Sequence, residues 1–161
     1  MFKEINAKDI KDNFIKIIAD EWALISAGTK DKYNMMTASW GFMGEMWGYD
    51  CIAAVIRPQR YTMELVDKNN YFTLSFYGDN KAIHGSKSGR DTDKTAETGL
   101  TPVFDGGAVY FNEARLVIIC KKLYLQQMKE ECFTDKEPLR WYDNDLHNIV
   151  IGKIEKVLVK E

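Results

Sequence analysis

Two arginines, a proline and a hydroxyl lie close together in the segment Arg57-Pro58-Gln59-Arg60-Tyr61-Thr62. Proline is favoured in the first turn of an α-helix, so a helix is expected to begin at this segment. Helix N-termini offer unpaired N–H groups and a favourable dipole, and arginine binds phosphate through paired hydrogen bonds. The segment therefore suits an anion, although by itself it is more typical of a capped surface helix with two solvated arginines.

Small, hydroxyl-bearing and basic residues form a second cluster over residues 85–94, with the sequence Gly-Ser-Lys-Ser-Gly-Arg-Asp-Thr-Asp-Lys. Its glycines allow the backbone to approach a ligand closely. The cluster is not a P-loop, because the required spacer and the terminal Gly-Lys-Ser/Thr are absent. A solvated loop would have the same composition. Two such clusters in a chain of formal net charge −2 make a shared anion site more credible than either cluster alone.

Residues 34–41 have the sequence Asn-Met-Met-Thr-Ala-Ser-Trp-Gly, in which small polar residues are flanked by Met36 and Trp40. Such a strand could present its backbone N–H and C=O groups to a flat heterocycle. The alternative is a core strand that uses methionine as filler, and the segment alone favours that alternative.

His84 and His147 are the two histidines of the chain. A single histidine is more often a structural hydrogen-bonding group than a catalyst, and without a cysteine nearby in sequence a metal site is not expected. The sequence contains no nucleophile elbow, no Gly-x-Gly-x-x-Gly and no zinc-ligand spacing.

Three cysteines, Cys51, Cys120 and Cys132, are odd in number and lack Cys-x-x-Cys spacing, which favours buried thiols in a reducing compartment. No signal-peptide core or membrane-spanning run is present, so a soluble, cytoplasmic protein is expected. The net charge of −2 gives no reason to expect nucleic acid or a membrane surface as a partner.

The elements that must position these clusters alternate between short helices and strands. Apolar residues at helical spacing predict an amphipathic helix over 6–20 with Asn6 as its N-cap. Apolar runs and period-two alternation predict strands at 22–27, 35–40, 51–56, 71–77, 116–125 and 149–159. Gly152 is expected to mark a bulge or a close approach in the last strand.

The connections between these strands are less regular. Repeated glycines predict an irregular loop over 41–50, and a polar connection is expected over 141–147. Short helices are predicted after Pro58, over 79–89 and in a turn that ends at Thr98. The pattern as a whole is an α+β chain, mainly β, with a closed or nearly closed sheet and one domain over residues 1–161.

Four sequence blocks together resemble the flavin reductase-like, FMN-binding split-barrel proteins. They are residues 34–41, residues 55–62 (Val-Ile-Arg-Pro-Gln-Arg-Tyr-Thr), residues 72–76 (Phe-Thr-Leu-Ser-Phe) and residues 88–94 (Ser-Gly-Arg-Asp-Thr-Asp-Lys). They occur in the family's order and at its spacing. His147, followed by Gly152 and Ile154, is similar to the family's carboxy-terminal His-x-x-x-x-Gly-x-Val/Ile element. The resemblance covers residues 10–158.

The resemblance implies a six-stranded Greek-key split β-barrel with short peripheral helices, which forms a homodimer with FMN near the subunit interface. In that family the Met-Thr-Ala-Ser-Trp segment contacts the isoalloxazine ring, largely through backbone, and the two basic segments hold the ribityl phosphate. His147 would lie near the nicotinamide or the flavin edge. The FMN-binding residues carried over are Asn34, Met36, Thr37, Ala38, Ser39, Trp40, Arg57, Arg60, Tyr61, Thr62, Ser86, Ser88 and Lys94.

The activity that the resemblance implies is that of an NAD(P)H-dependent flavin reductase. Hydride would pass from the nicotinamide C4 to the flavin N5, a step that depends on stacking the two rings about 3–3.5 Å apart. An alternative is a non-catalytic FMN-binding electron carrier, similar to flavoredoxin, that serves a redox protein partner. A third possibility is a structural dimer without a ligand. The family's reductases that serve monooxygenases carry Gly-Asp-His before the last strand, whereas this chain has Asp145-Leu146-His147.

Overall fold

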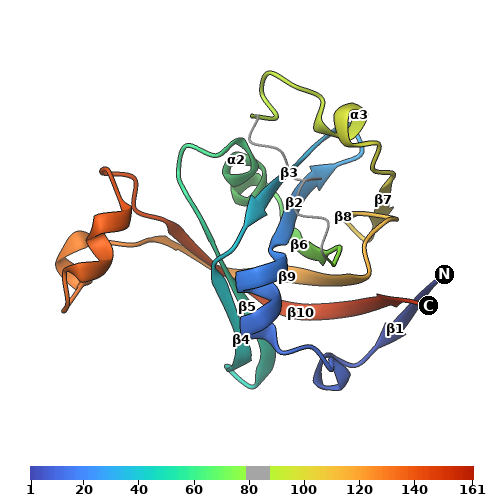
Figure 1. Cartoon of the computed structure of the whole chain (residues 1–161), viewed down its shortest axis with the longest axis horizontal. Coiled ribbons are helices and arrows are strands. Elements are labelled where there is room, and N and C mark those ends of the chain that lie inside the picture. Colours follow the sequence, from blue (N-terminus) through green and yellow to red (C-terminus); the bar gives the residue numbers. More distant parts are fainter. Residues whose placement is uncertain (79–87) are drawn as a thin grey trace.

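Most of the chain forms one antiparallel sheet, which the computed structural model in Figure 1 shows for residues 1–78 and 88–161. Its strands pair in the order β3-β2-β6-β9-β10-β5-β4, and β1 adds to β10. Their bounds are β1 Phe2–Ile5, β2 Ala23–Thr29, β3 Lys32–Ala38, β4 Gly41–Met46, β5 Tyr49–Ile56, β6 Tyr71–Phe76, β9 Leu116–Gln127 and β10 Asn148–Lys160. A separate hairpin contains β7 Pro102–Asp105 and β8 Ala108–Phe111.

The prediction of a mainly β chain is therefore confirmed. The six predicted strands correspond to β2, β3, β5, β6, β9 and β10, which are consecutive in the sheet. Strands β1, β4, β7 and β8 were not predicted. Within the described residues, no hydrogen-bonded pair joins β3 to β4 or β5 and closes the sheet into a barrel, although β3 and β5 come close to each other.

The concave side of the sheet encloses the main core. Phe72, Phe76 and Ile118 are fully buried there, together with Ile52 and Leu74. A second apolar cluster lies on the other side of the sheet, where Val117 packs beneath the β7–β8 hairpin. This double coverage explains why residues 116–120 of β9 are apolar and buried on both faces.

Gly152 marks both features that were expected of it. The pairing of β10 with β9 shifts register between Ile151 and Gly152, as a β-bulge does. A Cβ atom at Gly152 would lie 2.7 Å from Phe72 Cε1 and 2.8 Å from Cys120 Cβ. The close approach of two core side chains therefore requires a glycine at this position.

The predicted helix over 6–20 is wrong as a single element. The segment contains a 3-10 turn η1 (Ala7–Asp9), a short α1 (Phe14–Lys16) and a π-helical turn η2 (Ile17–Glu21). Asn6 caps η1, as predicted, and Asn13 caps the second start by accepting from the Lys16 N–H at 3.2 Å. Two competing asparagine caps therefore divide a segment that has helical apolar spacing throughout.

The predicted loop over 41–50 is also wrong, because β4 and the start of β5 form a hairpin there. Its turn residues, Trp47 and Gly48, have φ values of 58° and 76°, as a type I′ turn requires. Gly41 and Gly44 lie in β4, at the edge of the sheet. Strand β3 ends at Ala38, so residues 39 and 40 form a short link between β3 and β4.

The helix predicted after Pro58 begins three residues later than the proline. Helix α2 runs from Tyr61 to Lys68 with Arg60 at its N-cap, and Pro58 lies in a turn closed by the Arg60 N–H and the Arg57 carbonyl at 3.1 Å. The helical turn predicted to end at Thr98 is confirmed as α3 (Lys94–Thr98). The helix predicted over 79–89 lies almost wholly outside the described residues.

The segment between β9 and β10, residues 128–147, extends away from the sheet as the orange part of Figure 1 shows. It is called the arm below. It contains two 3-10 turns, η4 (Glu130–Cys132) and η5 (Glu137–Trp141), before the polar connection that the sequence predicted. Cys51 and Cys120 are buried free thiols, as expected, but Cys132 in the arm is exposed, so that prediction is wrong for Cys132.

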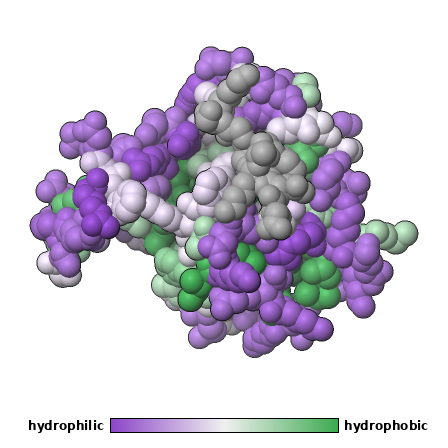
Figure 2. Space-filling model, viewed as in Figure 1, coloured by the Kyte–Doolittle hydropathy of each residue, from purple (hydrophilic) through white to green (hydrophobic). Residues whose placement is uncertain are grey.

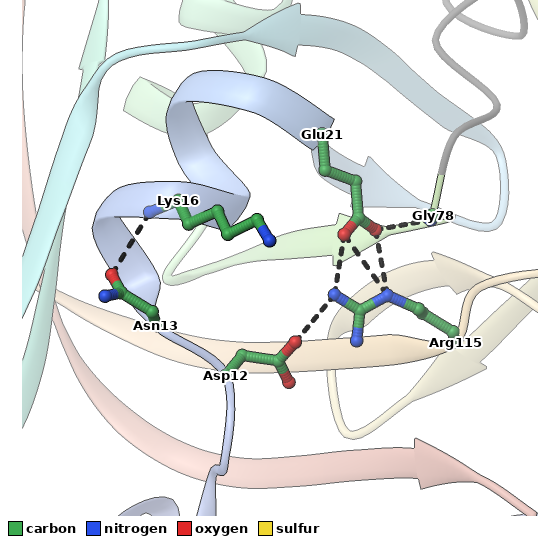
Figure 3. Close-up of polar contacts among 6 residues, drawn as sticks. All are labelled: Asp12, Asn13, Lys16, Glu21, Gly78 and Arg115. Atoms are coloured by element: carbon green, nitrogen blue, oxygen red, sulfur yellow. Dashed lines mark hydrogen bonds and ion pairs between the residues drawn. The ribbon is translucent and has the colours of Figure 1, made fainter.

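An ion cluster ties the amino-terminal segment to the ends of two strands (Figure 3). The Arg115 guanidinium donates to Glu21 at 2.6 Å and to Asp12 at 2.8 Å, and the Gly78 N–H also donates to Glu21. The Glu21 side chain is only 12% exposed. The cluster joins η2, the segment after β6 and the start of β9. It therefore stabilises the packing of the amino-terminal segment against these two strands.

Replacing Glu21 with alanine is expected to destabilise the fold by about 1–3 kcal/mol, because Arg115 and the Gly78 N–H lose their shared acceptor. Urea unfolding measures the change. The control is Glu137→Ala, since Glu137 and Arg140 form an exposed pair whose loss should cost less than about 0.5 kcal/mol. Equal effects of the two substitutions would contradict the stabilising role of the cluster.

Candidate functional site

Strand β3 lies at one end of the sheet, so one of its edges has no strand partner among residues 1–78 and 88–161. The Lys94 ammonium donates to the Met35 carbonyl at 2.9 Å across this edge. Backbone groups alternate in direction along a strand, so the N–H and C=O of Thr37 point to the same open edge. The β3 edge thus offers backbone hydrogen-bonding groups to a ligand.

One pocket at this edge, called the Lys94 pocket, has a volume of about 310 Å³. It lies between β3, the start of α2 and the loop that precedes α3. Its lining residues are Asn34, Met36, Thr37, Gln59, Arg60, Tyr61, Thr62, Ser88, Gly89 and Lys94.

Two cationic groups face the Lys94 pocket. Burial lowers the pKa of Lys94, and the nearby positive charge of Arg60 lowers it further. The Arg60 guanidinium makes no hydrogen bond or ion pair with any part of the chain that the structure describes. Two neighbouring cations without a carboxylate between them suit an anionic group.

The floor of the Lys94 pocket is held by a buried hydrogen bond. The Asn34 amide, which is 7% exposed, donates to Thr62 Oγ1 at 3.0 Å and thereby links β3 to α2. Gly89 packs directly on the Asn34 amide, where an added Cβ would overlap it. Glycine at this position therefore allows the loop before α3 to close against the pocket.

The second pocket, called the Trp40 pocket, has a volume of about 170 Å³ and shares Met36, Thr37 and Arg60 with the first. Thr37 Oγ1 is buried, and among residues 1–78 and 88–161 it has no hydrogen-bond partner. A ligand could satisfy this hydroxyl. The lining residues are Met36, Thr37, Ala38, Ser39, Trp40, Val55, Arg57, Arg60 and His147.

Aromatic rings form one wall of the Trp40 pocket. The Trp40 ring lies 5.1 Å from the His147 ring and 5.8 Å from the Trp141 ring, between centroids. Tyr142 adds a fourth ring, 5.3 Å from His147. The arm therefore returns to the sheet at this pocket and supplies three of the four rings, those of Trp141, Tyr142 and His147.

Arg57 lies in the Trp40 pocket and outside the Lys94 pocket. Its guanidinium pairs with Asp145 and donates to the Trp141 carbonyl at 2.9 Å. Asp145 also accepts from the Asp143 N–H at 3.0 Å and from Gln59 at 2.8 Å. The hydrogen bond from Asp143, together with those from Gln59 and Arg57, holds the pKa of Asp145 well below its usual range. Arg57 is thus engaged with the arm, whereas Arg60 is open to a ligand.

His147 is buried at the end of the arm, with its Nδ1 atom 2.8 Å from the Tyr142 hydroxyl oxygen. Burial lowers the pKa of His147 from 6.5 to about 4, and the positive charge of Arg57 contributes to this shift. The imidazole is therefore neutral at neutral pH and serves as a hydrogen-bonding group, not as a cation.

The lowered pKa of His147 makes stability depend on pH. Between pH 6.5 and pH 4 the unfolded chain binds a proton at this residue that the folded protein does not, so stability is lost as the pH falls. The loss is expected to reach about 2–3 kcal/mol at pH 4. Urea unfolding of the wild type and His147→Gln at both pH values measures it, and the same pH dependence in both proteins would contradict the assignment.

The structure brings together every described residue that the sequence proposed for cofactor binding. The segment from Met36 to Trp40 lines the Trp40 pocket, and the residues from the two basic segments line the Lys94 pocket, except for Arg57. Ser86 lies outside the described residues. Val55, Gln59 and Gly89 also line the pockets and were missed, although they lie inside the sequence blocks that carried the resemblance.

Tyr142 and Asp145 were missed for a different reason. They lie in the arm, where the sequence predicted only a polar connection. Tyr142 contacts Trp40 and His147, and Asp145 pairs with Arg57, which is 88 residues away in the chain. No local pattern marks such a contact. No helix of the described chain has the length and apolar character needed to cross a membrane.

Comparison with known proteins identifies relatives. A family profile described as a flavin reductase-like domain matches residues 16–161. The flavoredoxin of Desulfovibrio vulgaris (Miyazaki F) is similar, with 26% identity, coverage of 88% of this chain and 70% of that chain, and a TM-score of 0.67. No curated protein sequence matches the chain.

Two further solved structures share the fold. An FMN-binding protein from Thermus thermophilus, with bound p-hydroxybenzaldehyde, has 20% identity, coverage of 99% and 82%, and a TM-score of 0.67. A protein with a split barrel domain from Shewanella frigidimarina has 19% identity, coverage of 97% and 77%, and a TM-score of 0.69. The predicted split-barrel fold is confirmed by this likeness, but the main sheet has eight strands among the described residues and not the six that were predicted.

Proposed function

Because this chain belongs to the flavin reductase-like family, we propose that it binds FMN across the Trp40 and Lys94 pockets. The observation that supports this proposal is the joining of an aromatic pocket to a cationic one through Met36, Thr37 and Arg60. The flavin ring would lie in the Trp40 pocket and the ribityl phosphate in the Lys94 pocket.

The residues that line the two pockets fit FMN. The buried Thr37 hydroxyl, which lacks a partner in the described chain, would bond to a polar ring atom, as would the open backbone edge of β3. Arg60 and Lys94 would hold the phosphate, and Gly89 would let the loop approach it. Arg57 would act by holding the arm against the ring pocket.

We propose an NAD(P)H-dependent flavin reductase as the activity. When bound, FMN supplies a hydride acceptor at N5. The chain would contribute position and exclusion of water: Trp40 and the arm residues Trp141 and Tyr142 border the pocket with aromatic surface. Neutral His147 would offer a hydrogen bond at the ring edge without adding charge.

The alternative is an electron carrier that holds FMN and serves a redox protein. The likeness to the flavoredoxin of Desulfovibrio vulgaris, at 26% identity, favours this second function. The 39% exposure of Trp40 also leaves the ring pocket accessible from outside. Both candidates use the same site and differ in whether a nicotinamide reacts there.

Two measurements test these functions in order. Purified protein titrated with FMN is expected to quench the flavin fluorescence, and a failure to take up FMN would exclude both candidates. The FMN-loaded protein is then mixed with NADH or NADPH under anaerobic conditions. Bleaching of the flavin band at a catalytic rate supports the reductase, whereas no bleaching with either donor refutes it and leaves the carrier.

A homodimer is proposed from an apolar face on the outer side of the sheet. Phe42, Ala53, Ile151 and Tyr124 are register partners across β4, β5, β10 and β9, so they share one face. Hydrophobic residues are visible low on the surface in Figure 2, where Figure 1 draws both β4 and the amino-terminal helical segment. Large exposed apolar side chains on the hairpin and on β9 are Phe42, Met46, Trp47, Tyr49, Leu123 and Tyr124.

Phe42→Glu is expected to convert this dimer to a monomer, because Phe42 is 59% exposed and a charge there would be buried on association. Light scattering on a sizing column measures the mass. Ile15→Glu is the control, since Ile15 is 79% exposed on α1, outside this face. A monomeric wild type would refute the dimer.

A reducing, cytoplasmic setting is also proposed, and the exposed thiol of Cys132 supports it.

A further inference from the structure

Tyr142 lies in the arm and packs against two residues that line the Trp40 pocket, Trp40 and His147. Its ring meets the His147 ring edge to face, with centroids 5.3 Å apart at 79°, and it meets the Trp40 ring at 6.5 Å and 73°. Its hydroxyl oxygen is 2.8 Å from His147 Nδ1. Tyr142 therefore contacts the two ring-bearing residues of the pocket without belonging to any motif of the sequence.

Three contacts of Arg57 hold Tyr142 in place. The Arg57 guanidinium lies 5.3 Å from the centre of the Tyr142 ring, donates to the carbonyl of the preceding residue, Trp141, and pairs with Asp145 three residues further on. Arg57 follows directly on β5, which pairs with β10. The position of the Tyr142 hydroxyl is thus set by the sheet and not by the arm alone.

The direction of the hydrogen bond between Tyr142 and His147 follows from their protonation. Burial raises the pKa of Tyr142, so its hydroxyl keeps its proton at neutral pH, and the pKa of His147 near 4 leaves its ring with a single N–H. Within the described residues the Tyr142 hydroxyl has no acceptor besides His147 Nδ1. Each tautomer leaves one donor without a partner in the described chain: the phenolic O–H if Nδ1 is protonated, and the Nε2–H if it is not. The phenolic O–H is the stronger donor and the unprotonated imidazole nitrogen the stronger acceptor, which assigns the hydroxyl as donor to Nδ1 and the imidazole proton to Nε2.

We propose that Tyr142 is a positioning residue, which holds His147 as the Nε2–H tautomer and presents that N–H to an acceptor atom of a ligand in the Trp40 pocket. His147 lines that pocket, and its Nε2 atom has no hydrogen-bond partner in the described chain. The acceptor class is a carbonyl oxygen or an unprotonated ring nitrogen of a planar heterocycle. The identity of that ligand as a flavin, or as a ring stacked beside it, rests on the proposed function.

The tautomer can be observed directly in the whole, ligand-free chain by long-range ¹H–¹⁵N NMR of labelled histidine at neutral pH. The chain has two histidines, so His84→Gln identifies the signals of His147. His147 is expected to show a protonated Nε2 and a hydrogen-bonded, unprotonated Nδ1. A protonated Nδ1 in the wild type would overturn the inference, whatever the variants do.

Tyr142→Phe removes the hydroxyl and keeps the ring. It is expected to convert His147 to a mixture of both tautomers, while a thermal melt shows that the protein remains folded. Tyr124→Phe is the matched control, because the Tyr124 hydroxyl contacts Gln126 on β9 and should not affect His147. An unchanged tautomer in Tyr142→Phe would overturn the positioning role.

The readout requires no flavin, so the two proposals fail separately. A wild type that shows the expected tautomer but takes up no FMN refutes the proposed function and supports the role of Tyr142. A wild type that binds FMN but shows a protonated Nδ1 refutes the role of Tyr142 and supports the proposed function.

Discussion

Arg60→Ala is expected to weaken FMN binding by about 10- to 100-fold and to change riboflavin binding by less than about threefold, since a charge-assisted hydrogen bond contributes about 1.5–3 kcal/mol. FMN and riboflavin differ only in the phosphate. Arg60 faces the Lys94 pocket and has no partner in the described chain that must be displaced. Its whole charge is therefore available to the phosphate.

Arg57→Ala provides the sharpest comparison. Its guanidinium is occupied by Asp145 and the Trp141 carbonyl, so its loss should release the arm and affect FMN and riboflavin to a similar extent. Lys30→Ala is the control for overall charge, because Lys30 is exposed and lines neither pocket. Fluorescence titration measures both dissociation constants. Equal losses of FMN and riboflavin in Arg60→Ala would refute the phosphate assignment.

Gly152→Val is expected to destabilise the fold by about 3 kcal/mol, which is at the upper end of overpacking effects. Its Cβ would come within 2.8 Å of Cys120 Cβ and closer still to the Phe72 ring. Both neighbours are fully buried and belong to adjacent strands, so neither can move without disturbing the core. Denaturant unfolding, monitored by circular dichroism, gives the free energy.

Gly44→Val is the matched control for this substitution. Gly44 lies in β4 at the edge of the sheet, and an added Cβ would meet nothing within 4 Å. Valine also has a higher strand propensity than glycine, so this change should be neutral or stabilising. A loss of stability in Gly44→Val as large as in Gly152→Val would show that the loss of glycine itself, and not the crowding, is responsible.

The strands of the sheet could be read from the sequence because their signals are local. Apolar alternation and unbroken apolar runs identified six strands that are consecutive in the sheet. The glycine at position 152 correctly predicted a β-bulge in the last of them. Errors arose where two local signals competed. The asparagines at positions 6 and 13 both cap helical turns, and the glycines of residues 41–48 are compatible with an edge hairpin as well as with a loop.

The sequence by itself determined which residues carry the candidate site, because blocks with suitable chemistry stand in a recognisable order from Asn34 to Lys94. Only the tertiary structure decided which role each of these residues has. The sequence predicted the same phosphate-binding role for Arg57 and Arg60, yet Arg57 is neutralised by Asp145 of the arm and Arg60 is open to a ligand. The physical reason is that charge pairing depends on distance in space, and the arm returns to β5 only because β10 pairs with it. The return of the arm to β5 also places Tyr142 against His147. The Asn34–Gly41 segment was expected to be a ring-contacting strand, and in the structure its residues Met36 to Trp40 form one wall of a pocket to which the arm adds His147.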